Sequence, residues 1–599
     1  MKNIIKKLSN TNISMTYMFV LVGVSILMMV GYFSYAWFTV QGVQKYSIVT
    51  GNLTGILAIG SNTANINGAG VIEYTPTTDS DTITITVTNS SDRTVKNSLY
   101  YYNLDDDTIT LGYTSDSSTI PSVTGIEVEK GKSLTYKIKI TGAKDKTIKI
   151  GSSMGLINSD LALPNGASAL EKFSLTVSET LLAGVGDNGK IDTSDSEQTF
   201  ITGTDPNNYI WYSGKLWRAV SIDTTDNSVK LVTQWDITSI SYNVSGTPTF
   251  KGSYIEQWLN DTSVDGFLGN LREPEKFIKM DSVWDASLYT QMKTTMVTDA
   301  VGLLNKYEYE STGEADGYLK TGLSAWMLTP YSESTTTIYI LTNTSIGMYN
   351  AEPTALGGVR PAINLKSNIK ILDGAGTSDD PYRLEGDNDV LSSGTLLSTR
   401  YSGEYISFGT GENNLYRIVS HENGIGTKIA SAIPLKESGS FKEMTFGSDG
   451  TFSQDNVIGT FLNNDYLENE TYLTSEQVNM IEDNTTWYLG GLTSDNYKLA
   501  KYQNVAGNSL VTKVATGKVG LLRLGELMSS QFDTFEAYWL LSPTYDGSSS
   551  VNYSSEAGST RSLKANLNCA IKPAMNLKSN VVITGGDGTK NNPFQIKLG

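Results

Sequence analysis

The sequence predicts a mainly β protein with some α structure, built from one β-sandwich domain and two α+β domains that follow a single N-terminal transmembrane helix. Three features predict it: runs that alternate between apolar and polar residues, an internal duplication in the second half, and an uncharged apolar stretch near the start. The 599 residues suffice for several domains of ~100–200 residues each. Aliphatic and aromatic residues make up 39%, which is typical of globular chains and excludes wholesale disorder.

The apolar stretch covers residues 15–40 and contains the run YMFVLVGVSILMMVGYF, with no formal charge before Lys45. About 20 apolar residues are enough to cross a bilayer, so we expect a transmembrane helix or a long signal peptide here. Three lysines lie in residues 1–14, which the positive-inside bias predicts to be a cytoplasmic tail. The expected partner of this segment is the lipid bilayer, with everything that follows it extracellular.

A cleavage signal of the small-x-small type, Ser34-Tyr35-Ala36, lies inside this stretch. The phrase SYAWFT resembles the junction of camelysin and TasA-like surface proteins, although the Asp usual after the Thr is missing. The resemblance implies cleavage by a dedicated signal peptidase, after which the new N-terminus becomes part of a β-sandwich. The length of the apolar stretch favours a retained single-pass anchor, and cleavage after Ala36 would give a secreted protein.

Residues 41–185 are predicted to form the β-sandwich. Apolar and polar residues alternate at 82–88, 134–140 and 147–150, which places one face of each strand in a core. Clusters of Asn, Ser, Asp and Gly separate these runs, as expected for short antiparallel strands. The order of strands and turns resembles the small sandwich domains of bacterial surface proteins.

Residues 186–196 contain three carboxylates, Asp187, Asp192 and Asp195, at a spacing that could form a calcium loop. The complete twelve-residue pattern with its terminal Glu is absent. A simple acidic linker is the favoured interpretation, with calcium as a weak alternative and no other cofactor expected.

The duplication gives two homologous domains at 197–386 and 395–599, joined by a linker at 387–394. Five blocks recur in the same order, and the closing block VRPAINLKSNIKILDGAGTSDDPYRL matches IKPAMNLKSNVVITGGDGTKNNPFQI at 12 of 26 positions without a gap. Residues that mark the repeat in the first copy are Trp217, Arg218, Trp326, Pro330, Arg360, Pro361 and Asn364. Their counterparts in the second copy include Arg417, Trp539, Pro543, Lys572, Pro573 and Asn576.

Both copies resemble a domain of unknown function that is common in exported proteins of low-GC Gram-positive bacteria, with the pattern WYxGxLWR, QWLN, W(L/T)LxP and VRPxINLKS. More loosely, they resemble the C-type-lectin-like fold of formylglycine-generating enzymes and hypervariable binding proteins. The enzymatic activity of the former needs two thiols and is excluded, because Cys569 is the only cysteine. The calcium-dependent sugar motif of such lectins is unmatched, since the nearest text is Glu352-Pro-Thr354.

The remaining candidates favour packing over chemistry. Six tryptophans are expected in the core rather than in a glycan platform: Trp211, Trp217, Trp258, Trp326, Trp487 and Trp539. Arg360 and Lys572 are expected at strand ends beside an acid, with an anionic ligand as the alternative. His421 replaces Ile222 of the sister copy, which argues against a catalytic histidine. Asn364 and Asn576 each lie two residues before a lysine. A Lys–Asn crosslink of the kind known from Gram-positive pilins would also need a positioned buried carboxylate.

The net charge of −17 and the absence of a basic footprint exclude a nucleic-acid binder, and one His and one Cys exclude a zinc site built from several such ligands. We therefore expect a membrane-anchored, non-enzymatic surface protein of a Gram-positive-type bacterium. It would act in adhesion or recognition of an extracellular glycan or protein, through the polar loops 331–356 and 544–568. The alternative is a fibre- or matrix-forming subunit that self-assembles by strand addition after cleavage at Ala36. A hydrolase is the least favoured hypothesis.

Overall fold

Two compact units make up the chain, Met1–Phe173 and Ser174–Gly599, and each is described here by itself. The computed structural model describes residues 22–25, 53–66, 68, 70–102, 109–113, 125–159, 161–171, 173–243, 245–263, 266–332, 336–342, 348–387, 391–422, 426–489, 514–523, 526, 533, 536–544 and 549–599. Most of the predicted membrane segment therefore lies outside the described residues, and only 22–25 are seen, as helix. Over the ranges given, no helix is long and apolar enough to span a bilayer.

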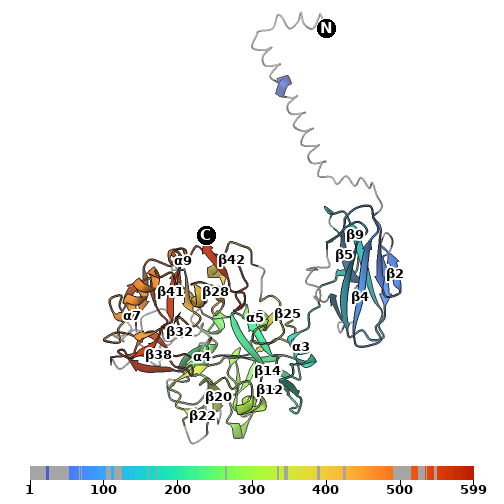
Figure 1. Cartoon of the computed structure of the whole chain (residues 1–599). Coiled ribbons are helices and arrows are strands. Elements are labelled where there is room, and N and C mark those ends of the chain that lie inside the picture. The colour runs from blue at the N-terminus through green and yellow to red at the C-terminus, as the bar shows by residue number, and fades with distance from the viewer. Residues whose placement is uncertain are drawn as a thin grey trace, which may run out of the picture. The chain divides into compact units, whose positions relative to one another are not determined.

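The first unit is a β-sandwich of two antiparallel sheets (Figure 1). One sheet has the strand order β2-β1-β4-β8-β6, and the other the order β10-β5-β9-β3 with β7 added beside β5. The strands are β1 Gly55–Ile59, β2 Asn62–Asn65, β3 Val71–Tyr74, β4 Ser80–Asn89, β5 Val95–Tyr102, β6 Thr110–Tyr113, β7 Ile126–Val128, β8 Ser133–Thr141, β9 Ile148–Gly155 and β10 Ala167–Ala169.

Alternation along β4 shows why this sequence folds as a sandwich. Ile83, Ile85 and Val87 point into the core between the sheets, and the intervening threonines face outward. On the outer face, Thr88 and Ser133 of the neighbouring β8 share a hydrogen bond of 2.8 Å between their hydroxyls. Period-two alternation thus separates the buried face from the solvated face, as the sequence predicts.

The second unit contains both predicted repeats, and its strands fall into two sets that run in the same order. The first set is β11 Gly189–Asp192, β12 Gln198–Gly203, β13 Tyr209–Tyr212, β14 Lys215–Asp223, β15 Val229–Thr233, β16 Thr238–Ser241, β17 Val283–Asp285, β18 Met296–Thr298, β19 Val301–Gly302, β20 Trp326–Pro330, β21 Ile338–Leu341, β22 Met348–Ala351, β23 Leu356–Val359, β24 Ala362–Leu365, β25 Ile371–Asp373 and β26 Tyr382–Leu384.

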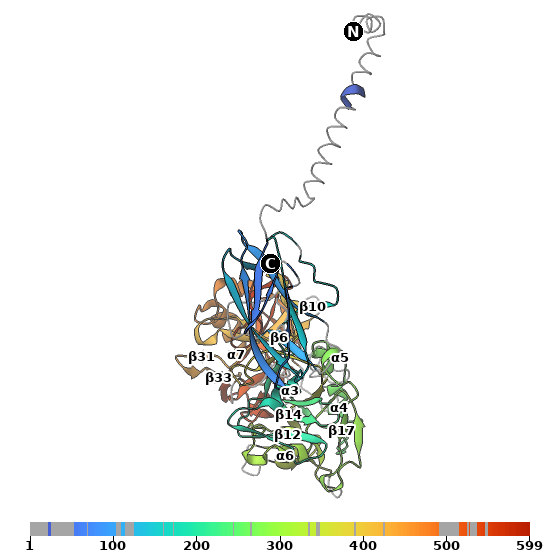
Figure 2. The same ribbon diagram turned by 90° about the vertical axis from the view of Figure 1, so that its right-hand side faces the viewer.

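The second set is β27 Thr395–Leu396, β28 Tyr405–Ser407, β29 Leu415–Glu422, β30 Gly426–Ser431, β31 Lys436–Glu437, β32 Ser440–Phe441, β33 Glu443–Thr445, β34 Thr485–Tyr488, β35 Val514–Gly517, β36 Val519–Leu521, β37 Tyr538–Pro543, β38 Ser550–Ser554, β39 Thr560–Lys564, β40 Asn568–Ala570, β41 Pro573–Leu577, β42 Val581–Gly585 and β43 Gln595–Leu598. The central order β13-β14-β15-β24-β19 of the first repeat recurs as β28-β29-β30-β41-β36 in the second. In both views the green first repeat and the orange-red second repeat form adjoining bodies (Figure 1, Figure 2).

Helices are short and lie between the strands. They are α3 Val177–Ala183, α4 Tyr254–Leu259, α5 Pro274–Phe277, α6 Lys306–Ser311, α7 Val457–Thr460, α8 Tyr466–Glu468 and α9 Ser475–Met480, with a π-helical turn at Phe461–Asp465. Short 3₁₀ turns occur at Leu268–Asn270, Tyr289–Gln291, Glu314–Asp316, Leu397–Thr399 and Gly411–Asn413. Capping boxes begin α3, α6 and α9, which explains why such short segments become helical. The chain is therefore mainly β with some α structure, in agreement with the prediction.

The boundary between the units differs from the predicted end of the sandwich at 185. Helix α3 belongs to the second unit, because Val177 and Leu181 are buried in the core of the first repeat. The predicted linker at 186–196 contains strand β11, which pairs with β12. The alternating pattern of the sandwich ends before α3, and the local signal for this helix is the capping box of Thr176 and Glu179.

Candidate functional site

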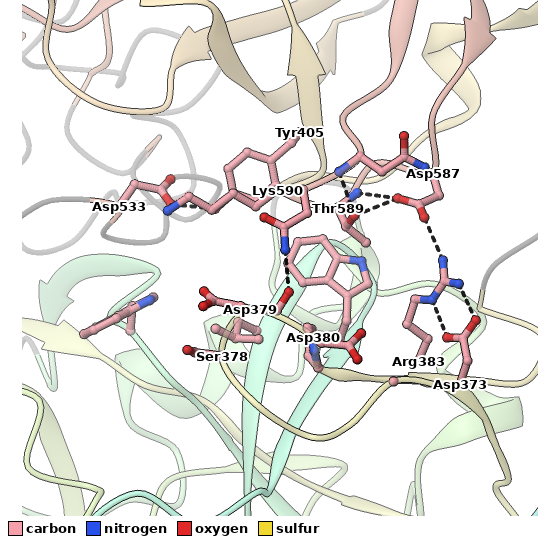
Figure 3. A pocket seen from close by; sticks show the side chains of 17 residues that line it. Asp373, Ser378, Asp379, Asp380, Arg383, Tyr405, Asp533, Asp587, Thr589 and Lys590 are labelled. Atoms are coloured by element: carbon pink, nitrogen blue, oxygen red, sulfur yellow. Dashed lines mark hydrogen bonds and ion pairs between the residues drawn. The ribbon is translucent and has the colours of Figure 1, made fainter. Parts of the chain in front are cut away.

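A cleft of about 600 Å³ lies between the two repeats, within the second unit (Figure 3). The first repeat contributes Trp211, Leu216, Trp235, Asp373, Gly374, Ser378, Asp379, Asp380, Pro381 and Arg383 to its walls, and the second contributes Tyr405, Asp533, Asp587, Thr589, Lys590, Asn591 and Asn592. Each repeat thus supplies one strand of its central sheet, β13 or β28, and the turn between its last two strands. The volume suits a ligand of a few sugar rings or a short peptide.

The two turns that face each other across the cleft have the same backbone architecture. Tyr209 N–H donates to Gly376 O at 3.0 Å in the first repeat, and Tyr405 N–H donates to Gly588 O at 2.8 Å in the second. Both glycines have positive φ, and a Cβ on Gly588 would lie 2.6 Å from the ring of Phe594. Glycine is therefore required at these positions. The two hydrogen bonds hold each turn against the strand β13 or β28 of its own repeat.

Aromatic side chains form the floor of the cleft. Trp211 of β13 stacks on Tyr405 of β28, with ring centroids 6.0 Å apart and an interplanar angle of 28°. Leu216 and Leu415 pack against the same small cluster, which joins the two repeats. Trp235 lines the cleft as well and remains partly exposed, so its side chain is accessible to a ligand.

The charged groups of the cleft fall into paired and unpaired sets. Arg383 forms ion pairs with Asp373 of its own repeat and with Asp587 of the other repeat, the latter at 2.7 Å (Figure 3). Asp379 and Asp380 are exposed at the rim, and within the described part of the chain no side chain donates a hydrogen bond to their carboxylates. The rim is therefore acidic, and the deeper walls are neutralised.

A layer of buried charge lies behind the wall formed by the second repeat. Asp533 accepts a hydrogen bond of 2.6 Å from Tyr405 Oη and forms ion pairs with Arg417 at 3.4 Å and with Lys590 at 3.3 Å. Lys572 is buried close to these groups, with its ammonium 4.8 Å from the centre of the Tyr538 ring. Burial lowers the pKa of Lys572 to about 7, although Asp533 acts against this shift.

The repeat arginines Arg218 and Arg417 occupy equivalent positions. Arg218 lies over the ring of Tyr209 at 3.6 Å, and Arg417 lies over the ring of Tyr405 at 4.4 Å. Arg417 also donates to Gly214 O of the first repeat at 3.2 Å. The two side chains are therefore packed into strand pairs, and the second one also connects the repeats.

Arg360, the counterpart of Lys572, is buried and donates to Thr233 O and Leu319 O at 2.8 Å each. Asp236 is the acid that acts on it electrostatically. Burial raises the pKa of Asp236 well above its usual value, against the opposing effect of Arg360. Among the residues that the structure describes, none is hydrogen-bonded to the Asp236 carboxylate.

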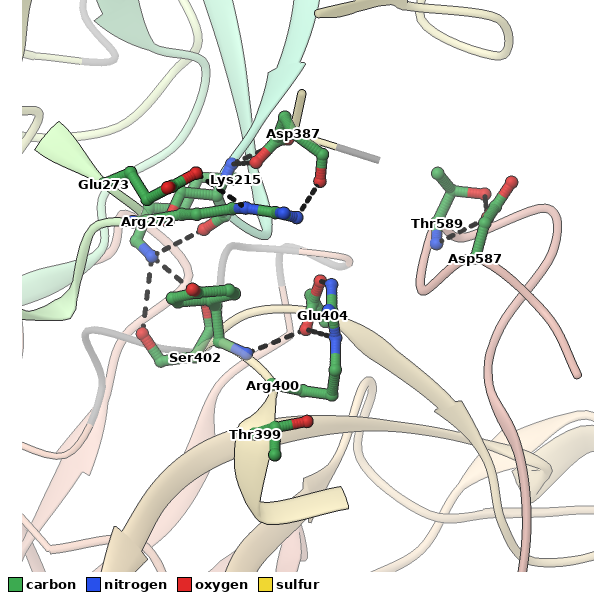
Figure 4. A network of polar contacts seen from close by, with 12 residues as sticks. Lys215, Arg272, Glu273, Asp387, Thr399, Arg400, Ser402, Glu404, Asp587 and Thr589 are labelled. Atoms are coloured by element: carbon green, nitrogen blue, oxygen red, sulfur yellow. Dashed lines mark hydrogen bonds and ion pairs between the residues drawn. The ribbon is translucent and has the colours of Figure 1, made fainter. Parts of the chain in front are cut away.

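A polar network joins the end of the first repeat to the start of the second (Figure 4). Lys215 donates to Ser402 O and Arg272 donates to Asp387 O, while Arg400 and Glu404 form an ion pair of 2.6 Å. Burial and the nearby Glu404 raise the pKa of Asp387 to about 7. The predicted linker 387–394 therefore begins with a buried residue that helps to hold the repeats together.

One further cluster occurs in both repeats. Lys230 of β15 contacts Glu308 of α6 in the first repeat, and Lys428 of β30 forms an ion pair of 2.9 Å with Glu526 in the second. Each lysine lies directly opposite the repeat asparagine on the adjacent strand, Asn364 or Asn576. The lysines two residues after these asparagines, Lys366 and Lys578, are not their partners, because their ammonium groups donate to Glu275 O and Asn479 O.

The other predicted repeat residues lie in strands. The three tryptophans that mark the repeats are buried, and each indole N–H donates to a backbone carbonyl: Trp217 to Tyr212, Trp326 to Ile240 and Trp539 to Met444. The prolines lie at strand ends: Pro330 closes β20, Pro543 closes β37, Pro361 precedes β24 and Pro573 begins β41.

The three candidate calcium ligands are only partly brought together. Asp195 accepts from two backbone N–H groups and from Tyr307 Oη at 2.6 Å, while Asp192 accepts from Ser194 N–H. In the part of the chain that the structure describes, the Asp187 side chain makes no hydrogen bond or ion pair. Across the described ranges, no group of three or more His, Cys, Asp or Glu side chains is arranged to hold a metal ion, and calcium stays a prediction.

The described parts of the two predicted recognition loops lie outside the cleft. None of the described residues of 331–356 or 544–568 lines the cleft. Part of the second loop packs on the first repeat, where Ser324 N–H donates to Ala557 O at 2.9 Å and Thr560 N–H donates to Ser239 Oγ at 3.1 Å. The sequence signal that could have identified the cleft is the duplicated Asp- and Asn-rich turn at the end of each repeat.

Comparison with protein-family models, with curated proteins and with solved structures finds no match to this chain. The function proposed below therefore depends on the geometry of the cleft and on the pattern of the sequence.

Proposed function

We propose that this protein is a non-enzymatic recognition protein of a bacterial cell surface, anchored in the membrane through residues 15–40, and that it binds a saccharide in the cleft between its repeats. The observation that carries this proposal is the composition of the cleft, which combines an accessible tryptophan with a rim of carboxylate, amide and hydroxyl groups. Pockets that bind small ligands specifically have this combination of apolar surface and a few placed polar groups.

Each part of the cleft suits a sugar. The face of Trp235 offers an apolar surface on which the C–H face of a pyranose can stack. The side chains of Asp379, Asp380, Asn591 and Asn592 are exposed around it and can accept from or donate to ring hydroxyls. The unpaired carboxylates would also favour a positively charged amino sugar over an acidic one.

The arrangement of the acids supports binding rather than hydrolysis. Glycoside hydrolysis needs two carboxyl groups that flank the scissile bond. Asp373, Asp533 and Asp587 are held in ion pairs with cations, and Asp379 and Asp380 are adjacent residues on one turn. The two unpaired carboxylates of the rim therefore approach a ligand from the same side.

Binding of purified full-length protein to an array of glycans and cell-wall polymers tests the proposal. For a saccharide identified in this way, we expect Trp235→Ala to weaken the affinity at least about tenfold, because aromatic contacts dominate such sites. Tyr349→Ala is the matched control, since Tyr349 is an exposed aromatic residue outside the cleft. Saccharide binding that is unaffected by Trp235→Ala and by Asp379→Asn would contradict the assignment of the cleft.

The anchor is tested separately by N-terminal sequencing of the protein from its native membrane. A protein that starts at Met1 supports a retained anchor, and one that starts at Trp37 supports the fibre-forming alternative. Filaments in electron micrographs of the purified protein would favour that alternative further.

A further inference from the structure

Lys428 and Asn576 lie directly opposite each other on β30 and β41, two neighbouring strands of the five-stranded sheet of the second repeat. Residues opposed in an antiparallel pair project from the same face, with Cβ atoms about 4.5–5.5 Å apart. The flexible lysine stem can therefore bring its amine to the carboxamide of the asparagine. Asn576 Oδ1 is buried without a hydrogen-bond partner among the described residues, and Nδ2 has only a contact of 3.4 Å to Thr485 Oγ1.

A carboxylate completes this cluster. Glu526 Oε1 accepts a hydrogen bond of 2.9 Å from Lys428 Nζ, and the ring of Trp487 lies 5.4 Å from the same nitrogen. Lys428, Glu526 and Asn576 are all buried, with exposed fractions of 4%, 0% and 0%. Burial acts to raise the pKa of Glu526, but Lys428 and Arg523 outweigh it and hold the pKa below its usual value. Glu526 is therefore ionised, and its Oε1 already contacts the Lys428 ammonium from which it would take a proton.

We propose that Lys428 and Asn576 condense to an intramolecular amide, with Glu526 moving the protons. Glu526 takes one proton from the Lys428 ammonium, and the neutral amine attacks Cγ of Asn576. The Nζ–Cγ bond forms, and Nζ gives its second proton to Nδ2 as the Cγ–Nδ2 bond breaks, so that ammonia departs. Glu526 passes the first proton to this ammonia, which leaves as ammonium. The carboxylate is thereby regenerated, and no oxidant is required. The attack of an amine on a carboxamide is slow in water. The fold accelerates it by holding the two groups next to each other in a site without water.

The first repeat has the same three residue types but a wetter setting. Lys230 and Asn364 are half-buried, and both line a cavity of about 190 Å³ together with polar residues such as Ser221 and Asp223. A site that is open to water lacks the dry, fixed geometry on which the condensation depends. The bond is therefore assigned to the second repeat alone, and the first repeat serves as an internal control.

The crosslink would join the central strands of a sheet in a chain whose one cysteine cannot form an internal disulfide. Mass spectrometry of the intact full-length protein tests it: the mass should lie about 17 Da, the mass of ammonia, below that of the uncrosslinked chain. A tryptic digest should contain a branched peptide that joins Lys428 to Asn576. Glu526→Gln should restore the full mass, as should Lys428→Arg, whereas Glu308→Gln in the first repeat should leave the loss of ammonia unchanged.

The intact mass of the wild-type protein decides the matter even if a variant fails to fold. A wild-type mass without any loss would overturn the proposal. A branched peptide that joins Lys230 to Asn364 would overturn its assignment to the second repeat. The result is independent of saccharide binding, so the two proposals can fail separately.

Discussion

Lys572 is the buried cation whose replacement gives the sharpest test of the electrostatics behind the cleft. Burial lowers its pKa from the ordinary 10.5 to about 7, and its sister in the first repeat is Arg360. Replacement by methionine keeps the length and apolar character of the stem and removes the titrating group. The variant Lys572→Met therefore isolates the cost of burying this amine.

The sign and size of the effect follow from the two pKa values. Between pH 7 and pH 10.5 the unfolded chain holds a proton on Lys572 that the folded chain has released, so stability rises with pH in this window. Each unit of pKa difference corresponds to about 1.4 kcal/mol, so from pH 7 to pH 10 the wild type should gain about 4 kcal/mol relative to Lys572→Met.

Denaturant titrations followed by tryptophan fluorescence measure this difference. Eight of the nine tryptophans lie in the second unit, so the signal reports the unfolding of the repeats. Subtracting the free energy of unfolding of Lys572→Met from that of the wild type at each pH removes the contributions of other groups that titrate in this range. Lys590→Met is the matched control, because Lys590 is exposed beside the same Asp533 and should leave the profile of the wild type unchanged. Parallel profiles of wild type and Lys572→Met from pH 7 to pH 10 would refute the reasoning.

Two further predictions concern the contact between the repeats. The Asp387 carboxyl keeps its proton up to about pH 7 in the folded chain, so the free energy of unfolding of the wild type should fall by about 4 kcal/mol from pH 4 to pH 7. Asp387→Asn should lack this fall in the same fluorescence titration. A variant that keeps the pH dependence of the wild type would contradict the assignment. Trp211→Ala removes the ring stacked on Tyr405 and should cost about 3–5 kcal/mol, with the unfolding of the repeats splitting into two calorimetric transitions, whereas Tyr349→Ala should change stability by less than about 0.5 kcal/mol.

Local patterns in the sequence were sufficient to predict the sandwich strands. Ile83, Ile85 and Val87 alternate with threonines, and the side-chain period of a strand places these residues on one buried face whatever their distant partners are. Helix α3 was missed because its seven residues follow the last alternating run and acquire their buried environment from the core of the first repeat. Elements of this kind are fixed by packing rather than by a periodic signal.

The duplicated Asp- and Asn-rich turns mark one part of the cleft in the sequence, but its other walls could not be predicted, because their residues converge only when the two repeats dock. Arg383 and Asp587, which form an ion pair across it, are more than 200 positions apart, and neither is unusual in its local context. Buried Glu308 and Glu526 were within reach of sequence analysis. Both follow the duplicated VGLL block at the same spacing, in VGLLNKYE and VGLLRLGE. Their significance depends on the lysines of distant strands, which only the fold brings close.

The cleft depends on differences between the copies as much as on their likeness. Asp587 aligns with Ala375, and Arg383 aligns with Gln595. The ion pair between Arg383 and Asp587 therefore has no equivalent between residues 595 and 375, the matching positions of the opposite copies. Trp211, which stacks on Tyr405, aligns with Ser407 in the same way. A single repeat, or two identical repeats, would therefore lack the floor and one wall of this cleft. The shape and charge of the cleft are consequently properties of the unequal pair, while the shared Lys–Glu–Asn cluster belongs to the scaffold that each copy retains.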